Sequence, residues 1–242
     1  MPAVMKRTEK KHSLAIRWLH WVNFPVLLVM LWSGLLILWA YDAYPTERFA
    51  LKVPDRISIH RGGVTPVYGD RNADDYPVPA GERRDIALGF RLAEGMNWHF
   101  TFAWLFTLNG VAYVLYVWLS GEWRHLLPRR DSFQGAFLVV LHDLRLRKEP
   151  PPREKFNHAQ RIAYTSVTVL GALMVVTGLA LYKPTQLSWL VTLLGGYQAA
   201  RLEHFVLTVL IVLFFFVHLA QVARAGWNNF RAMITGWEVR KG

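Results

Sequence analysis

The segment between Arg201 and Arg224, RLEHFVLTVLIVLFFFVHLAQVAR, constrains this chain most, because it is an apolar run that contains two histidines. Its length is about that needed to cross a bilayer as an α-helix. His204 and His218 lie fourteen positions apart. On a helix, the second side chain therefore returns to within about 40° of the first, roughly 21 Å further along the axis. The segment predicts a membrane-spanning helix with two imidazoles on one face, one near each membrane surface.

Ionisable side chains inside a membrane span are costly and usually functional. Two haems stacked across the membrane, each taking one axial ligand from this helix, would use the spacing of His204 and His218. The alternative is that both histidines only form hydrogen bonds in helix packing. Their position on the same face of the helix would then be accidental.

Composition sets the class of protein. The chain has 242 residues, of which 53% are hydrophobic, and the apolar residues gather into four segments long enough to span a membrane. We expect an all-α membrane protein, a four-transmembrane-helix bundle in one domain over residues 1–242. Cysteine is absent, which excludes iron–sulfur clusters bound by this chain, covalent c-type haem and disulfides. The predicted spans cover about residues 18–40, 98–119, 161–182 and 203–223.

Two long connections separate the predicted spans. Residues 41–97 form an outer loop rich in proline and glycine, in which only residues 82–96 have a helical pattern. Residues 120–160 are strongly basic and include a short amphipathic segment, 132–146, which predicts a helix lying in the membrane interface. Three prolines at 150–152 would end any helix there. We expect residues 1–17 to lie at the membrane surface and the tail beyond the last span to be polar.

The charges predict the orientation. The N-terminal segment to residue 17, the 121–161 connection and the tail from residue 224 hold 18 Lys and Arg but only 7 Asp and Glu. The connections 41–97 and 183–203 hold 10 of each. Because basic residues favour the cytoplasmic side, the pattern predicts a multi-pass protein of a bacterial inner membrane with both termini in the cytoplasm. The net charge of +11 is thereby explained, and no nucleic-acid partner is expected.

This topology arranges four histidines in two level pairs. His20 and His218 fall near the cytoplasmic face, and His99 and His204 fall near the outer face. Two imidazoles on one iron suit a low-spin haem that transfers electrons. We therefore predict two b haems, an inner one held by His20 and His218 and an outer one held by His99 and His204.

Two glycines support this assignment. Gly34 lies fourteen positions after His20, and Gly110 lies eleven after His99, so each returns to about the same helix face at the level of the other haem. A residue without a side chain would let a porphyrin edge approach the helix. Ordinary packing of small residues between membrane helices is the alternative explanation.

The motifs RWLHW at the start of the first span and KFNHAQR at the start of the third, with the histidine pair of the last span, resemble the di-haem cytochrome b family. That family includes the b-type cytochrome subunits of nickel–iron hydrogenases, the gamma subunits of formate dehydrogenases and the cytochrome b subunits of thiosulfate reductases. The resemblance implies an electron-transfer subunit that links membrane quinone to a peripheral, molybdopterin- or hydrogenase-type oxidoreductase on the outer face. It does not cover residues 41–97, so the identity of the partner stays open.

The resemblance also implies a quinone site. In formate dehydrogenases of this family, an Asn and a Gln three residues later lie beside the quinone pocket, and Asn157 and Gln160 match that pattern. Their amides could bind quinone carbonyls, and His158 could carry protons, since its ordinary pKa is about 6.5. The alternative is that Asn157 and Gln160 only cap the third span.

Two other functions compete with that of an electron-transfer subunit. One is a stand-alone enzyme of the b561 kind that oxidises superoxide or another small reductant at its outer face, so whether the chain is a complete enzyme stays open. The other is a histidine-lined transport protein without haem, which the absorbance of the purified protein would exclude.

Overall fold

The computed structural model describes residues 6–40, 56–60, 63–67, 84–87, 92–143, 145–149 and 156–241. Four of its helices are long and apolar enough to cross a membrane, over Leu14–Leu38, Leu92–Leu119, His158–Tyr182 and Tyr197–Thr235. The predicted class, an all-α membrane protein with four spans, is confirmed. The chain divides into two compact units, the first made of residues 1–22 and 107–242 and the second of residues 23–106.

The surfaces of the long helices are those of membrane spans. Large apolar side chains are exposed along all four of them, and an apolar surface of this extent is unfavourable in water. An α-helix can present it to lipid because its backbone hydrogen bonds are satisfied internally. The chain is therefore a multi-pass membrane protein. Examples of these exposed side chains are Leu28, Leu35, Trp104, Leu108, Val169, Leu173, Val206, Leu213 and Phe216.

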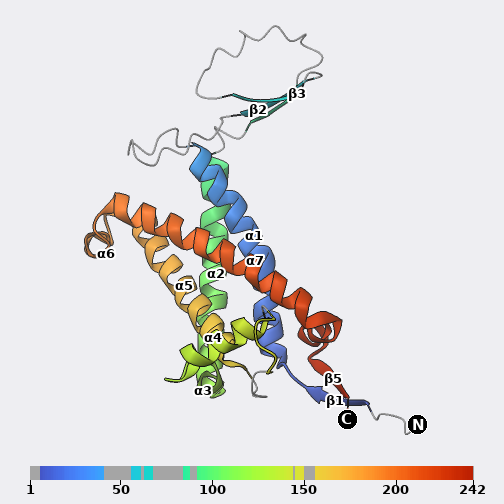
Figure 1. The fold of residues 1–242 in the computed structure, drawn as a ribbon. Coiled ribbons are helices and arrows are strands. Elements are labelled where there is room, and N and C mark those ends of the chain that lie inside the picture. The colour runs from blue at the N-terminus through green and yellow to red at the C-terminus, as the bar shows by residue number, and fades with distance from the viewer. Residues whose placement is uncertain are drawn as a thin grey trace. The chain divides into compact units, whose positions relative to one another are not determined.

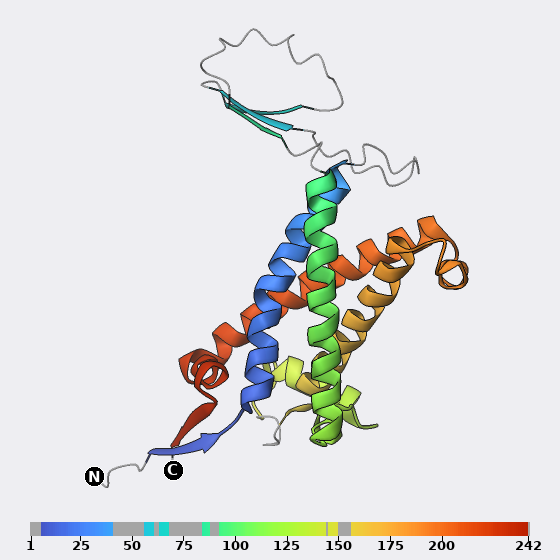
Figure 2. The same ribbon diagram turned by 180° about the vertical axis from the view of Figure 1, so that it is seen from behind.

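In the first unit, helix α5 (His158–Tyr182) packs against helix α7 (Tyr197–Thr235), and the short helix α6 (Ser188–Leu193) lies at the turn between them (Figures 1 and 2). Ala180, Leu190 and Ala200 form the buried cluster at this turn. Gly195 and Gly196 follow α6 with φ values of 80° and 102°, which residues with a Cβ rarely adopt. These glycines allow the chain to reverse into α7.

Two short helices lie against α5 on its N-terminal side. The predicted interfacial helix is helix α4, Ser132–Asp143, and a further helix, α3 (Trp123–Leu126), was not predicted. A Cβ on Gly135 of α4 would lie 2.4 Å from the ring of His158, so only glycine permits this close approach. The prolines at 150–152 lie outside the described residues.

Helix α7 is longer than the predicted last span. Its path breaks at Gly226, where φ is 79°, and helical structure then continues to Thr235. The polar segment predicted after residue 223 therefore begins with further helical structure, which the sequence did not predict. The left-handed glycine lets the chain leave the direction of the span without ending the helical hydrogen bonding for long.

The two ends of the chain pair with each other, which the sequence analysis did not predict. Strand β1 (Lys6–Lys10) runs antiparallel to strand β5 (Trp237–Lys241), as Figure 1 shows beside the N and C labels. The expectation that residues 1–17 only lie at the membrane surface is incomplete. The pairing depends on residues over two hundred positions apart, and neither strand has a strong apolar alternation to reveal it.

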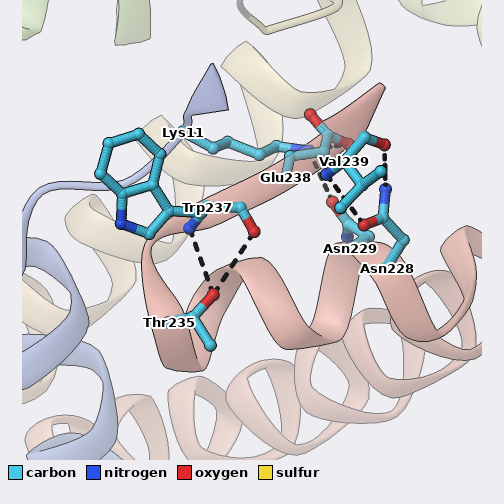
Figure 3. A network of polar contacts seen from close by, with 7 residues as sticks. All are labelled: Lys11, Asn228, Asn229, Thr235, Trp237, Glu238 and Val239. Carbon is cyan, nitrogen blue, oxygen red and sulfur yellow. Dashed lines mark hydrogen bonds and ion pairs between the residues drawn. The ribbon is translucent and has the colours of Figure 1, made fainter. Parts of the chain in front are cut away.

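Polar contacts hold this pair of strands to the end of α7 (Figure 3). Lys11 Nζ lies 2.7 Å from Asn229 Oδ1 and 3.0 Å from Glu238 Oε1. The side chain of Asn228 bonds both backbone groups of Val239, donating to its carbonyl at 2.9 Å and accepting from its N–H at 3.1 Å. The backbone N–H of Trp237 donates to the hydroxyl of Thr235 at 3.2 Å. These bonds satisfy polar groups that would otherwise be exposed at the end of the helix.

In the second unit, the later part of helix α1 (Leu14–Ala40) lies close to the start of helix α2 (Leu92–Leu119). A Cβ on Gly95 would lie 2.9 Å from Leu36 Cβ and 3.2 Å from the carbonyl oxygen of Ser33. This glycine allows the two helices to approach each other. Helix α2 also begins six residues before the predicted start of the second span.

The long connection contains a small antiparallel sheet that was not predicted. Strands β2 (Arg56–His60), β3 (Gly63–Val67) and β4 (Arg84–Ala87) are ordered β3-β2-β4. The prediction of a helix over 82–96 is therefore wrong at residues 84–87, where pairing with β2 overrides the local helical pattern. The remaining residues of the predicted outer loop, 41–55, 61–62, 68–83 and 88–91, lie outside the described residues.

Candidate functional site

The structure brings His20 and His218 together in the first unit. The two rings, one from α1 and one from α7, have centroids 6.0 Å apart and planes inclined by 56°. The ring of Trp21 meets that of His20 edge-on at 5.2 Å, and Phe214 stacks on His218 at 6.1 Å with only 10° between the planes. Aromatic contacts of this kind favour particular arrangements of the two rings. The role of the pair as haem ligands stays a prediction.

The space between His20 and His218 fits a metal held by both rings. A metal about 2 Å from one nitrogen of each imidazole would place the centroids roughly 6 Å apart, which agrees with 6.0 Å. Nδ1 of His20 is buried, and within the described parts of the chain it has no hydrogen-bond partner. Among those same residues, no group of three or more His, Asp or Glu side chains could hold a metal ion. Two lone imidazoles suit a group that brings its own equatorial ligands, as a haem does.

His204, near the start of α7, is supported by α5. Oγ1 of Thr177 lies 2.8 Å from Nδ1 of the imidazole. A Cβ on the next residue, Gly178, would lie 3.4 Å from Cε1 of the same ring. Thr177 is almost fully buried, at 2% exposure, so the contact is shielded from solvent. The ring therefore lies close against the backbone of α5, with one nitrogen hydrogen-bonded.

His99, in the second unit, has the same kind of support from α1. Oγ of Ser33 lies 3.0 Å from Nδ1 of the ring. The next residue is Gly34, whose Cβ, if it had one, would lie 3.4 Å from Cε1. Ser33 is fully buried. Gly34, predicted to lie beside a porphyrin edge, thus borders an imidazole here, and its contact with haem stays a prediction.

Two further parts of the predicted site are not tested by these contacts. His99 belongs to the second unit and His204 to the first, so their pairing is carried by the sequence argument and stays a prediction. A Cβ on Gly110 would meet no described atom within 4 Å. The predicted role of Gly110 beside a haem also stays a prediction.

Comparison with known proteins decides the family. Residues 11–236 match the family described as prokaryotic cytochrome b561. The chain belongs to this family. Over 141 residues it is also 34% identical to a protein of Azospira oryzae named "Putative protein-methionine-sulfoxide reductase subunit YedZ1", an alignment that covers 58% of this chain and 70% of that protein. No solved structure matches the present chain significantly.

Membership of the cytochrome b561 family confirms the predicted resemblance to b-type cytochromes. It makes the chain a membrane haem protein that takes part in electron transfer and binds haem of the b type. The haem-free transport protein considered from the sequence is therefore excluded.

A capping box at the start of α5 is formed by Asn157 and Gln160. Oδ1 of Asn157 accepts from the backbone N–H of Gln160 at 2.8 Å, and Oε1 of Gln160 accepts from the backbone N–H of Asn157 at 3.0 Å. This reciprocal pair satisfies two backbone donors of the first helical turn. His158 packs against Gly135, and its Nδ1 is buried without a partner in the described part of the chain. Contact of these three side chains with quinone stays a prediction.

Sequence reasoning missed Ser33, Thr177 and Gly178. A signal existed in the sequence, because Ser33–Gly34 and Thr177–Gly178 are hydroxyl–glycine pairs that interrupt predicted spans. Small residues in membrane helices are usually assigned to helix packing, and no histidine lies near either pair in the sequence. Their relation to His99 and His204 becomes visible only when the helices are placed side by side.

Proposed function

We propose that this cytochrome b561-family chain is a di-haem electron-transfer subunit of a bacterial inner membrane. It links a peripheral oxidoreductase on the outer face to the membrane quinone pool, with both termini in the cytoplasm. The excess of basic residues on the connections assigned to the cytoplasm supports this orientation. The proposal extends the family's electron-transfer role to a defined pair of end points.

The observation that carries the proposal is the pair His20 and His218. Their 6.0 Å separation and the aromatic rings beside them support a bis-imidazole haem site. We assign the inner haem to these two side chains. A haem bound there supplies reversible one-electron chemistry at its iron, while ligation by both imidazoles leaves no open position for oxygen.

We assign the outer haem to His99 and His204. The level of each residue in the predicted topology supports this pairing. A second argument comes from each histidine by itself, since a hydroxyl bonds Nδ1 in both cases. Ring nitrogens of metal-ligating histidines commonly have such partners on the side away from the metal.

The partner is proposed from the relative and from the outer connection. The Azospira oryzae protein is named as a subunit of a protein-methionine-sulfoxide reductase, which favours a subunit over a stand-alone b561-like enzyme. By analogy, the peripheral partner of this chain is an oxidoreductase. Residues 41–97 are the largest segment on the proposed outer side, so we place the docking surface there.

The quinone site is proposed at the start of α5. Asn157 and Gln160 use their side-chain oxygens in the capping box, and their amide N–H groups are the donors proposed for a quinone carbonyl. His158 is the proposed proton carrier, because reduction of quinone to quinol consumes two protons. These three residues belong to the same unit as His20 and His218.

Two experiments on membranes containing the full chain test the proposal. Addition of a short-chain quinol should reduce both haems, and the removal of the inner ligand in His20→Ala should abolish reduction of the outer haem by quinol. Reduction of the outer haem at the parent rate in His20→Ala would contradict the proposed path. A periplasm-specific reporter inserted near residue 71 should be active, and activity of a cytoplasm-specific reporter there would overturn the orientation.

A further inference from the structure

The supports of His99 and His204 have the same construction on two different helices. In each case a buried hydroxyl lies within 3.0 Å of Nδ1, Ser33 for His99 and Thr177 for His204. The residue after each hydroxyl is a glycine whose Cβ would lie 3.4 Å from Cε1 of the ring. The two cases occur in separate units of the chain, so they are two independent observations of one arrangement.

The hydroxyl protons determine which ring nitrogen carries hydrogen. A serine or threonine hydroxyl has one proton to donate. Ser33 directs its hydroxyl to the carbonyl of Val29 at 2.7 Å, and Thr177 directs its own to the carbonyl of Leu173 at 2.8 Å. Because backbone carbonyls only accept, each hydroxyl proton is committed to the helix. The hydroxyl oxygen is then left as an acceptor for the imidazole.

The histidine must therefore supply the proton of the remaining bond. A neutral imidazole carries one N–H, and in His99 and His204 it lies on Nδ1, which donates to the hydroxyl oxygen. Nε2 of each ring is consequently the nitrogen with the lone pair. This is the form of imidazole that binds a metal through Nε2.

We propose that Ser33 and Thr177 are positioning residues that lock His99 and His204 in the Nδ1–H tautomer and present Nε2 of each ring to iron. This inference rests on the proposed function, in which the two histidines hold the outer haem. Gly34 and Gly178 complete the arrangement, since a bulkier residue would push the ring away from its hydroxyl. The hydrogen bond also makes each imidazole a stronger electron donor to the metal.

A difference in potential follows. Stronger donation from the ligands stabilises ferric over ferrous iron, so the hydrogen bonds lower the midpoint potential of the outer haem. Nδ1 of His20, by contrast, has no such partner among the described residues. The hydroxyls therefore act on one haem of the two.

The alternative explanation is that the hydroxyls of Ser33 and Thr177 only form hydrogen bonds to the preceding helical turn, as serine and threonine commonly do in helices. Thr208 is an example of such a bond to the preceding turn, because its hydroxyl donates to the carbonyl of His204 at 2.8 Å. Thr101 does the same toward the carbonyl of Asn97, also at 2.8 Å. In the described part of the chain these two hydroxyls contact backbone carbonyls in the same way as Ser33 and Thr177 but are not placed at Nδ1 of His99 or His204, so both provide matched controls.

The test compares Ser33→Ala and Thr177→Val with the controls Thr101→Val and Thr208→Val, and uses Thr177→Ser as the conservative variant. Haem content and redox titration of the haem absorbance are measured on the full chain in membranes. We expect Ser33→Ala and Thr177→Val to raise the midpoint of the outer haem by a roughly tenfold change in the ferric-to-ferrous ratio, about 59 mV. The controls and Thr177→Ser should keep the parent value.

The other possible results also support or overturn the positioning role of Ser33 and Thr177. Selective loss of the outer haem in Thr177→Val, with both haems kept in Thr177→Ser and Thr208→Val, supports the positioning role. Midpoints equal to those of the controls overturn it, as does an equal loss of haem in variants and controls. If His99→Ala and His204→Ala leave haem content unchanged, the assignment of the outer haem fails instead.

Discussion

His20 and His218 differ from His99 and His204 in what supports their rings. The first pair is bordered by aromatic rings, with Nδ1 of His20 buried and unpaired in the described part of the chain. The second two each have a buried hydroxyl at Nδ1 and a glycine at Cε1. The same type of side chain is thus held in two chemical environments. Two haems of one kind can differ in potential when the residues behind their ligands differ.

The largest effect should come from removal of the four proposed haem ligands. His20→Ala or His218→Ala should eliminate only the proposed inner haem, and His99→Ala or His204→Ala only the proposed outer one, because each substitution removes one of the two side chains that would hold that haem. Haem content and reduced-minus-oxidised spectra of purified variants measure this. The division into two sites would break if one substitution from each proposed pair removed the same spectral component.

A smaller effect is expected from filling the space beside the imidazoles. Gly178→Val should lower occupancy of the outer haem by at least about ten-fold, because its methyl groups would displace the ring of His204 from Thr177. Gly178→Ala should stay near the parent, since its Cβ would lie 3.4 Å from Cε1, at the edge of ordinary contact. The measurement is haem titration of each variant. Equal occupancy in Gly178→Val and the parent would show that the glycine does not position the ring.

The smallest effect concerns the start of α5, where substitutions of Asn157 separate its capping role from its proposed quinone-binding role. Asn157→Ala should lower the free energy of unfolding by about 1 kcal/mol through loss of the cap, and should slow haem–quinone exchange without changing haem spectra. Asn157→Asp keeps a capping oxygen but lacks the amide donor, so its stability should match the parent while exchange is still slow. Gln160→Ala should also slow exchange.

Thermal unfolding and stopped-flow exchange with quinol are the measurements for Asn157 and Gln160. Exchange at the parent rate in Asn157→Asp would leave capping as the role of this residue and would place the quinone pocket elsewhere.

The sequence was sufficient for the spans because their length and apolar content are local properties. Helices α1, α2, α5 and α7 all contain predicted spans. The approach of His20 to His218 was also accessible, since charge placed the spans in alternating directions and fourteen-residue spacing placed the imidazoles. Such arguments work because a bilayer restricts each span to one axis and two directions.

The features that could not be predicted from the sequence depend on contacts between segments remote in sequence. One example is the pairing of residues 6–10 with 237–241, and another is the strand at 84–87. In both cases the local sequence does not indicate which segment the strand pairs with. The relation of Thr177 to His204 depends on the rotation of α5 against α7, which hydrophobic periodicity fixes only coarsely. From the sequence, Asn157 could bind quinone or cap the third span, and only the geometry at the start of α5 revealed the capping box.

The proposed electron path needs two b haems in this chain, so the decisive quantity is the number of haems per chain. Pyridine haemochrome analysis of the purified full chain, combined with quantitative amino-acid analysis, gives that number. We predict two haems per chain, falling to one in His218→Ala and one in His204→Ala. A value of one in the parent protein would contradict the account.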